Sequence, residues 1–268
     1  MFVPVLLFIV GLLFLIKGGD WFVDGASALA RRFHLPELLI GATVVSIGTT
    51  LPEVMVSTMS AVSGNAIGSV ICNAALIAAI TIAVRPGKVD PKTLKTPVLF
   101  FFAAAAIYCI AAYGFGKFTR PMGILMLTVF VAYMVVNVMQ MKNSPTEVQT
   151  AEEELMPLPK TLILLVVGAV AIAIGANLLV DNGTLIAQSL GVPESVIALT
   201  FVALGTSLPE LVTAITSLIK GHSDLSVGNV VGANVFNLVL VSGMSITLAP
   251  FTIPQSATLF GINSSLVL

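Results

Sequence analysis

Residues 46–53 and 203–210 carry nearly the same eight-residue motif, and no other feature restricts the fold of this chain as much. The first copy reads Ser-Ile-Gly-Thr-Thr-Leu-Pro-Glu and the second Ala-Leu-Gly-Thr-Ser-Leu-Pro-Glu. Their glutamates, Glu53 and Glu210, are 157 residues apart, and the same offset holds without a gap over residues 11–60. It matches glycines, prolines and acidic residues of one half with those of the other. Such a repeat predicts two halves of one architecture that pack against each other.

The match resumes after residue 60 with a different offset. Residues 64–68 (Gly-Asn-Ala-Ile-Gly) match residues 228–232 (Gly-Asn-Val-Val-Gly), and the correspondence ends at Asn73 and Asn237. The offset is 164 here, so the first copy is seven residues shorter than the second. What it lacks corresponds to the polar loop at 220–224 (Lys-Gly-His-Ser-Asp).

The composition places both halves in a membrane. A mean hydropathy of +1.06, with 57% hydrophobic and 9% charged residues, excludes an ordinary soluble domain. Apolar runs of about 18 residues or more recur along the chain, which predicts an all-α polytopic membrane protein. The first run lacks a basic region before it, so we interpret it as a membrane helix rather than a cleaved signal peptide. The expected spans are 2–32, 36–62, 66–84, 96–114, 121–141, 161–190, 193–219, 226–249 and a partial span at 253–268.

One extended polar segment divides the chain. We interpret residues 143–159 as a cytoplasmic linker between a first half at 1–142 and a second half at 160–268. With the N-terminus outside, most basic loop residues fall on the cytoplasmic side, as the positive-inside rule requires. They are Arg31, Arg32, Arg85, Lys88, Lys92, Lys95, Lys142, Lys160 and Lys220, against only Lys117 and Arg120 in outer loops.

The number of spans between the two repeats sets their relative orientation. Five spans separate the start of one copy from the start of the next, and five is odd. The copies therefore enter the membrane from opposite sides, and such inverted repeats place a binding site near the bilayer midplane. The sequence predicts an alternating-access transporter in the cell (inner) membrane.

Glu53 and Glu210 are the main candidates for that site. A carboxylate inside an apolar run costs several kcal/mol unless it faces a partner or a water-filled path. The preceding proline frees a backbone carbonyl and is expected to break each helix, so carboxylate, hydroxyl and carbonyl oxygens converge as ligands for a hard cation. A single glutamate could instead cap a helix, but two at matching positions favour one cation site built from two broken helices. Two carboxylates without a cation repel each other, and Ca²⁺, Na⁺ or protons relieve this repulsion in exchange for one another.

The other polar residues of the repeat could either bind the cation or form hydrogen bonds within and between helices. Serine and threonine hydroxyls often bond to their own helix, and intramembrane asparagines often join helices. Proximity to the glutamates and symmetric placement favour a ligand role for Thr49, Thr50, Thr206, Ser207, Asn73 and Asn237. The glycines at 64, 68, 228 and 232 are expected to allow close helix packing, Asp24 to make an interfacial pair, and His34 and His222 to be solvated in loops.

These motifs resemble the two α-repeats of the sodium/calcium exchangers, in the calcium/cation antiporter superfamily, and the chain is most similar to prokaryotic members. The resemblance covers nearly the whole chain. It implies two inverted five-helix repeats, ten helices in all, of which the last one and a half are absent from this sequence. It also implies four ion sites clustered between the second, third, seventh and eighth helices.

The resemblance also implies roles for individual residues. Glu53 and Glu210 would be the carboxylates shared by Ca²⁺ and Na⁺. Thr49 and Thr206 would contribute carbonyls or hydroxyls, and Ser46 and Ala203 their carbonyls. The sodium and water positions would be completed by Thr50, Ser207, Ser69, Asn73 and Asn237.

This chain departs from the family pattern at two site positions. Many relatives have an aspartate at the position of Asn237, so the site here has two carboxylates only. Ala233 stands where a hydroxyl matching Ser69 is expected. Because Asn237 leaves only two carboxylates at the site, protons remain an alternative to Na⁺ as the coupling ion.

We therefore predict a non-enzymatic antiporter that exchanges Ca²⁺ for Na⁺, with Ca²⁺/H⁺ exchange as the alternative. A cation channel is less favoured because channels usually repeat their sites by rotational symmetry. A membrane-embedded hydrolase is less favoured because no nucleophile–base set accompanies the glutamates. We expect Ca²⁺ and Na⁺ as transported ions, no organic cofactor, the lipid bilayer and inorganic cations as partners, no nucleic acid, and a monomer.

Overall fold

The computed structural model describes residues 2–60, 69–84, 91–143, 155–193, 205–252, 258–259 and 262–263, and these are mostly helical, with four short strands and connecting turns. The α-helices are α1 (Phe2–Arg32), α2 (Glu37–Ile40), α3 (Ser46–Ser60), α5 (Ala78–Val84), α6 (Pro91–Cys109), α7 (Arg120–Asn143), α8 (Leu158–Ser189), α11 (Leu208–Ile219), α12 (Ser223–Phe236) and α13 (Ser242–Leu248). Four π-helical segments continue them: η1 (Gly41–Val45), η2 (Cys72–Ile77), η3 (Ile110–Phe115) and η5 (Asn237–Val241). The antiparallel strand pairs are β1 (Lys117–Phe118) with β2 (Phe251–Thr252), and β3 (Thr258–Leu259) with β4 (Ile262–Asn263).

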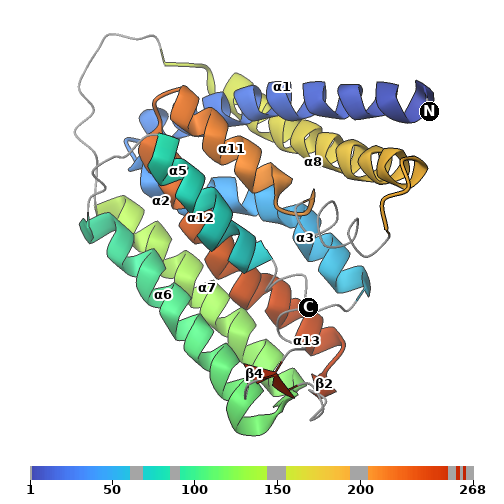
Figure 1. Ribbon diagram of the computed structural model, residues 1–268. Helices are drawn as coiled ribbons and strands as arrows, with labels where there is room; N and C mark the ends of the chain where they lie inside the picture. Colours follow the sequence, from blue (N-terminus) through green and yellow to red (C-terminus); the bar gives the residue numbers. More distant parts are fainter. Residues whose placement is uncertain are drawn as a thin grey trace.

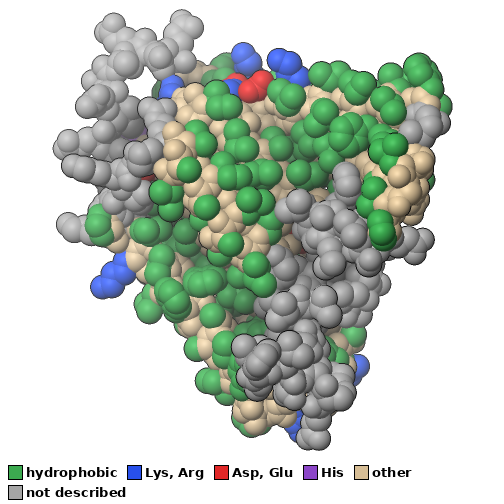
Figure 2. Space-filling model, viewed as in Figure 1, with side chains coloured by type: hydrophobic (Ala, Val, Ile, Leu, Met, Phe, Trp, Pro, Cys, Tyr) green, Lys and Arg blue, Asp and Glu red, His purple; other side chains and the backbone are tan. Residues whose placement is uncertain are grey.

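Five helical stretches in the described residues are long and apolar enough to cross a bilayer. They are Phe2–Arg32, Leu94–Phe115, Arg120–Lys142, Leu158–Ser189 and Ser223–Leu248, and three shorter apolar helices accompany them. Figure 2 shows hydrophobic side chains spread across the described part of the visible face, with charged side chains near its edges. An apolar exterior of this kind fits lipid as the surrounding medium. The prediction of an all-α multi-pass membrane fold is confirmed.

The two longest helices, α1 and α8, are equivalent in the repeat and lie side by side across one edge of the molecule (Figure 1). Glycines allow this close approach. A Cβ on Gly11 would lie 2.9 Å from the carbonyl oxygen of Gly175, and one on Gly18 would lie 3.0 Å from that of Gly168. The offset of 157 relates Gly11 to Gly168 and Gly18 to Gly175. The contact is therefore antiparallel and two-fold symmetric, as inverted repeats require.

The remaining helices form a second body, in which α12 packs against α2, η1 and α3. A Cβ on Gly228 would meet the carbonyl oxygen of Leu38, and one on Gly232 would meet the hydroxyl of Ser46. The packing role predicted for these two glycines is confirmed. The matching glycines at 64 and 68 lie outside the described residues.

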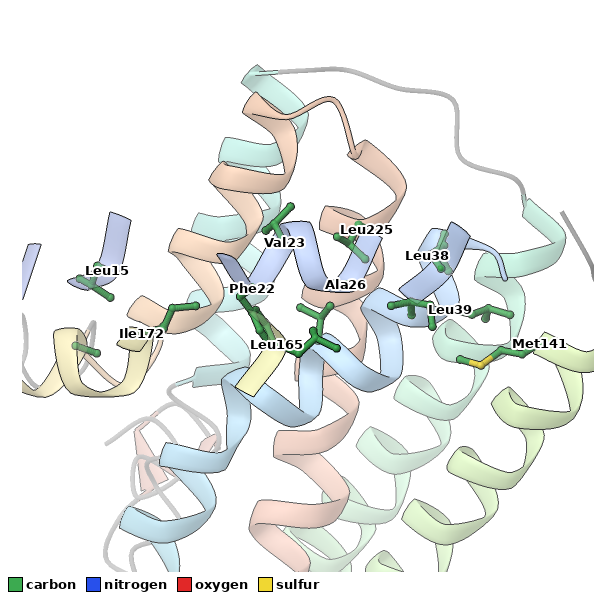
Figure 3. Packing of buried hydrophobic residues seen from close by; sticks show 14 residues of the cluster. Leu15, Phe22, Val23, Ala26, Leu38, Leu39, Met141, Leu165, Ile172 and Leu225 are labelled. Atoms are coloured by element: carbon green, nitrogen blue, oxygen red, sulfur yellow. The ribbon is translucent and has the colours of Figure 1, made fainter. Parts of the chain in front are cut away.

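Two clusters of buried apolar side chains hold the helices together, and the first of them joins the α1–α8 pair, which is the first body, to the second body. One cluster, shown in Figure 3, lies where α1 and α8 meet α2 and α12, and includes Phe22, Val23, Leu38, Leu165 and Leu225. A second cluster is built by α6, α7, α12, η5 and α13, around the buried rings of Tyr108, Phe118, Tyr133 and Phe236. Together the clusters hold α12 at the centre of the molecule.

The structure changes two details of the predicted helices. The break expected at Pro52 is absent, because α3 runs from Ser46 to Ser60 and the irregular backbone lies earlier, in η1. The second copy does begin a new helix at its motif, where Ser207 precedes α11 and Pro209 occupies its first turn. The described residues of the partial span expected at 253–268 are the paired strands β3 and β4 rather than helix. Residues 144–154 of the predicted linker lie outside the described part.

The two longest helices end in the same backbone motif. After α1, the amide of Leu35 donates to the carbonyl of Ala30 while His34 is left-handed with φ 53°. After α8, the amide of Val192 donates to the carbonyl of Ala187 while Gly191 has φ 77°. His34 and Gly191 are equivalent in the repeat, so a histidine occupies a position that favours glycine.

Replacement of His34 by glycine is expected to stabilise the protein. The left-handed conformation costs a non-glycine residue about 1 kcal/mol, and the exposed His34 ring makes no hydrogen bond within the described residues. The reciprocal change Gly191→His should destabilise by a similar amount. Thermal unfolding in detergent should show the midpoint of His34→Gly raised and that of Gly191→His lowered. Equal midpoints for both variants would contradict this interpretation.

Candidate cation site

The candidate site lies between the two repeat motifs. Glu53 is on α3 and Glu210 is in the first turn of α11, and both are 0% exposed. Their carboxyl groups are close enough to interact directly with each other. The two glutamates that the sequence places 157 residues apart therefore meet inside the protein, each contributed by the equivalent helix of its half.

Hydroxyl groups surround the two carboxylates. The Thr50 hydroxyl donates to Glu210 Oε1 at 3.3 Å, and Thr49 also lies beside Glu210. Ser69 lies beside Glu53, and its Oγ is 3.5 Å from the hydroxyl of Thr206. Each carboxylate thus has hydroxyls from the opposite repeat or from a neighbouring helix within reach.

Several buried polar atoms at this site have no hydrogen-bond partner among the described residues. Buried polar groups are almost always hydrogen-bonded in proteins, and an unsatisfied one costs about 1–3 kcal/mol. The atoms concerned are both carboxylate oxygens of Glu53, Oε2 of Glu210, Oγ of Ser207, and both side-chain polar atoms of Asn73 and of Asn237. Most of these atoms are oxygens, the donor type that Na⁺ and Ca²⁺ prefer. The described residues contain no group of three or more His, Cys, Asp and Glu side chains that could hold a metal ion, so a cation held here would need hydroxyl or amide oxygens besides the two carboxylates.

Both asparagines lie in π-helical turns. Asn73 is the second residue of η2, and Asn237 is the first residue of η5. A π-helical turn shifts the hydrogen-bond pattern of a helix and frees backbone groups, and it is frequent at functional sites. After η5, the carbonyl of Asn237 accepts both the backbone amide of Ser242 and its hydroxyl, the latter at 3.0 Å. Ser46 does the same after η1, where its hydroxyl donates to the carbonyl of Gly41 at 2.9 Å.

The structure brings six of the predicted site residues into contact with one another, namely Glu53, Glu210, Thr49, Thr50, Ser69 and Thr206. Glu53, Glu210, Thr49, Thr50, Thr206, Ser207, Ser69, Asn73, Asn237 and Ser46 are described, and all but Thr206 are nearly or fully buried. Ala203 lies outside the described residues. The loop prediction for His222 is wrong in one respect: its Nδ1 is 2.8 Å from Glu37 Oε1, so the ring is paired rather than solvated.

Sequence reasoning missed two residues that hold the first repeat in place. Asn229 is fully buried, and its Oδ1 accepts a hydrogen bond from the Thr49 hydroxyl at 3.3 Å. Its position between Gly228 and Gly232, matched by Asn65, could have identified it. Tyr133 on α7 donates from its hydroxyl to the carbonyl of Ala42 in η1 at 2.9 Å. No sequence pattern pointed to that contact.

Comparison with known proteins places the chain in a family. The sequence model of one protein family, described as "Sodium/calcium exchanger protein", matches residues 3–139 and 160–268 of this chain. The chain belongs to this family. It is 36% identical over 262 residues to the inner membrane protein YrbG of Escherichia coli (strain K12), covering 91% of this chain and 79% of that protein. It is 31% identical over 300 residues to the sodium/calcium exchanger MaX1 of Methanosarcina acetivorans, covering 95% and 86%.

The fold agrees with that of a solved exchanger. The structure of the sodium-calcium exchanger NCX_Mj soaked with 10 mM Na⁺ and zero Ca²⁺ superposes with a TM-score of 0.82 at 30% identity, covering 94% of this chain and 84% of that one. Family membership and this fold make the chain a multi-pass cation antiporter of a transporter family.

Proposed function

We propose that this sodium/calcium exchanger family member exchanges Ca²⁺ for Na⁺ by alternating access, and that both ions bind between Glu53 and Glu210. The observation that carries the proposal is the meeting of these two carboxylates, fully buried and with three of their four oxygens unpartnered among the described residues. Two adjacent buried carboxylates need compensating positive charge. Because one Ca²⁺ and two Na⁺ each supply two positive charges, the same pair can hold either and exchange them.

The remaining candidates complete this assignment. We assign Thr49, Thr50, Thr206, Ser207, Ser69, Asn73 and Asn237 as oxygen ligands, and Ser46 and Ala203 as carbonyl donors. Their hydroxyl and amide oxygens provide the six to eight contacts that Ca²⁺ takes. The distribution of basic loop residues supports an N-terminus outside the cell membrane. We propose that the protein functions as a monomer, because one chain contains both repeats and therefore both glutamates.

The two bodies of the fold support the alternating-access step. The pair α1–α8 contacts the other helices mainly through the apolar cluster that includes Phe22, Val23 and Leu165. Apolar contacts are non-directional, so one body can shift against the other as a rigid unit. Phe22 of α1 lies against Gly48, next to Thr49 of the site: a Cβ on Gly48 would be 2.5 Å from Phe22 Cζ. Val180 of α8 lies against the equivalent Gly205. Movement of the pair would therefore cover or uncover the two motifs in turn.

Flux into reconstituted vesicles tests the proposed exchange. Vesicles loaded with Na⁺ and diluted into Na⁺-free buffer should take up radioactive Ca²⁺, and vesicles loaded with K⁺ should not. If Ca²⁺ uptake is instead driven by a pH gradient and is unaffected by Na⁺, then protons are the coupling ion. That alternative is favoured by one observation, namely that Asn237 leaves the site with two carboxylates. Ca²⁺ flux without any counter-ion gradient would instead indicate a channel.

A further inference from the structure

Lys220 joins the two bodies of the fold by an ion-pair cluster. It lies between α11 and α12, and its Nζ is 2.7 Å from Asp24 Oδ1 and 3.5 Å from Asp20 Oδ1, both on α1. The same nitrogen donates to the backbone carbonyl of Asp20 at 3.0 Å. The Lys220 side chain is 24% exposed, so this is a partly desolvated cluster rather than a free surface lysine. One residue of the second body thus holds two carboxylates of α1.

The backbone around Lys220 is fixed to the second body. Gly221 is left-handed with φ 89°, its amide donates to the carbonyl of Leu218, and the amide of His222 donates to that of Ser217 at 2.8 Å. This is a Schellman motif, which ends α11 with Lys220 as its cap. The pair of His222 with Glu37 ties the same turn to α2. A displacement of α1 would therefore break the cluster rather than carry Lys220 along.

The cluster lies where α1 approaches the helix that carries Glu210. A Cβ on Gly19 would be 2.9 Å from Thr216 Oγ1 and from Val212 Cγ1 of α11. Phe22, which lies against Gly48 of the site, falls between Asp20 and Asp24 on α1. The Lys220 cluster therefore holds α1 in the position in which Phe22 lies against the first repeat motif.

The opposite half has no equivalent cluster in the part of the chain that the structure describes. The repeat relates Asp24 of α1 to Asp181 of α8, and Asp181 makes no ion pair with a described residue. The first repeat copy also lacks the seven residues that correspond to the loop with Lys220. Among the described residues, the Lys220 cluster therefore has no counterpart in the other half.

We propose that Lys220, Asp20 and Asp24 form a one-sided latch, which keeps α1 against α11 and closes the route to the cation site from the Lys220 side. The proposal rests on the alternating-access function proposed above. A contact made in only one of two states shifts their populations by its differential energy. A half-exposed cluster contributes up to about 1 kcal/mol, which corresponds to about fivefold in the ratio of the two states.

Lys220→Gln tests the latch, with Lys17→Gln as the matched control. Lys17 also pairs with Asp20, at 3.8 Å, but it lies on α1 itself and is 67% exposed. Hydrogen–deuterium exchange of residues 17–26 and 216–222 should speed up several-fold in Lys220→Gln and stay unchanged in Lys17→Gln. The charge swap Asp24→Lys with Lys220→Asp should restore slow exchange. Unchanged exchange in Lys220→Gln, or no recovery in the swap, would overturn the latch whichever ions the protein carries.

Transport measured from each side provides the second readout. In right-side-out and everted membrane vesicles, Lys220→Gln should strengthen the apparent affinity for Ca²⁺ presented on the Lys220 side and weaken it on the other, by up to about fivefold. General damage to the fold would change both sides in the same direction, and that result would also overturn the proposal. Absence of Na⁺-dependent Ca²⁺ flux in the unmodified protein would contradict the proposed function alone, because the hydrogen-exchange result does not depend on it.

Discussion

Replacing Glu53 or Glu210 by glutamine is expected to abolish Ca²⁺ binding. Glutamine keeps the shape of the side chain and one oxygen but removes one of the two negative charges that face each other. A bound Ca²⁺ then keeps an uncompensated buried charge, and removal of one partner from such a buried arrangement costs about 3–5 kcal/mol. This corresponds to a dissociation constant at least about 100-fold higher.

Calorimetric titration of Ca²⁺ into the purified protein measures this effect directly. Glu37→Gln is the matched control, because Glu37 is an acidic residue of the same helical stretch that pairs with His222 outside the site. It should bind Ca²⁺ as the unmodified protein does. Without Ca²⁺, Glu53→Gln and Glu210→Gln should unfold at a temperature no lower than the unmodified protein, because each removes one of two buried like charges. Micromolar Ca²⁺ binding in both variants would contradict the assignment.

Gly228→Ala should destabilise the protein and abolish transport, although Gly228 contacts no predicted ligand. Its added Cβ would overlap the backbone carbonyl of Leu38, which cannot rotate away as a side chain can. Overpacking of a close contact costs about 1–3 kcal/mol and displaces the backbone. Because Asn229 follows directly and bonds Thr49, a shift of α12 here also moves the first repeat motif.

The matched control for this variant is Gly114→Ala, since a Cβ on Gly114 would come no closer than 3.8 Å to Ile110. Thermal unfolding in detergent should show a clear fall in the midpoint for Gly228→Ala and little change for Gly114→Ala. Na⁺-driven Ca²⁺ uptake should be lost only in the first variant. An unchanged midpoint and normal uptake in Gly228→Ala would show that α12 and α2 do not need their close contact.

The internal repeat made the centre of this site predictable. Matched positions identified Glu53 with Glu210 and Asn73 with Asn237, because an inverted repeat brings equivalent residues together about a two-fold axis. The packing role of Gly228 followed from the same comparison. These positions were predictable because residue type and spacing, which can be read from the sequence alone, identify them.

Backbone irregularity was less predictable. Pro52 removes a backbone donor, yet α3 continues through it and the irregular turn lies in η1. The π-helical turns at Asn73 and Asn237 were not predicted either. In η1, the carbonyl of Ala42 accepts the hydroxyl of Tyr133, which lies on a distant helix. Such contacts join residues far apart in the chain and leave no periodic pattern. Pairing of His222 with Glu37 was missed for the same reason.

The most direct test of the central claim is the position of a bound divalent cation. Crystals of the protein soaked in Ca²⁺ should show one anomalous peak in contact with the carboxylates of both Glu53 and Glu210, at the 2.3–2.6 Å typical of Ca²⁺–oxygen bonds. A soak with Na⁺ in excess should remove the peak. A Ca²⁺ ion held by only one of the two glutamates, or bound elsewhere while both carboxylates contact only protein, would contradict the account.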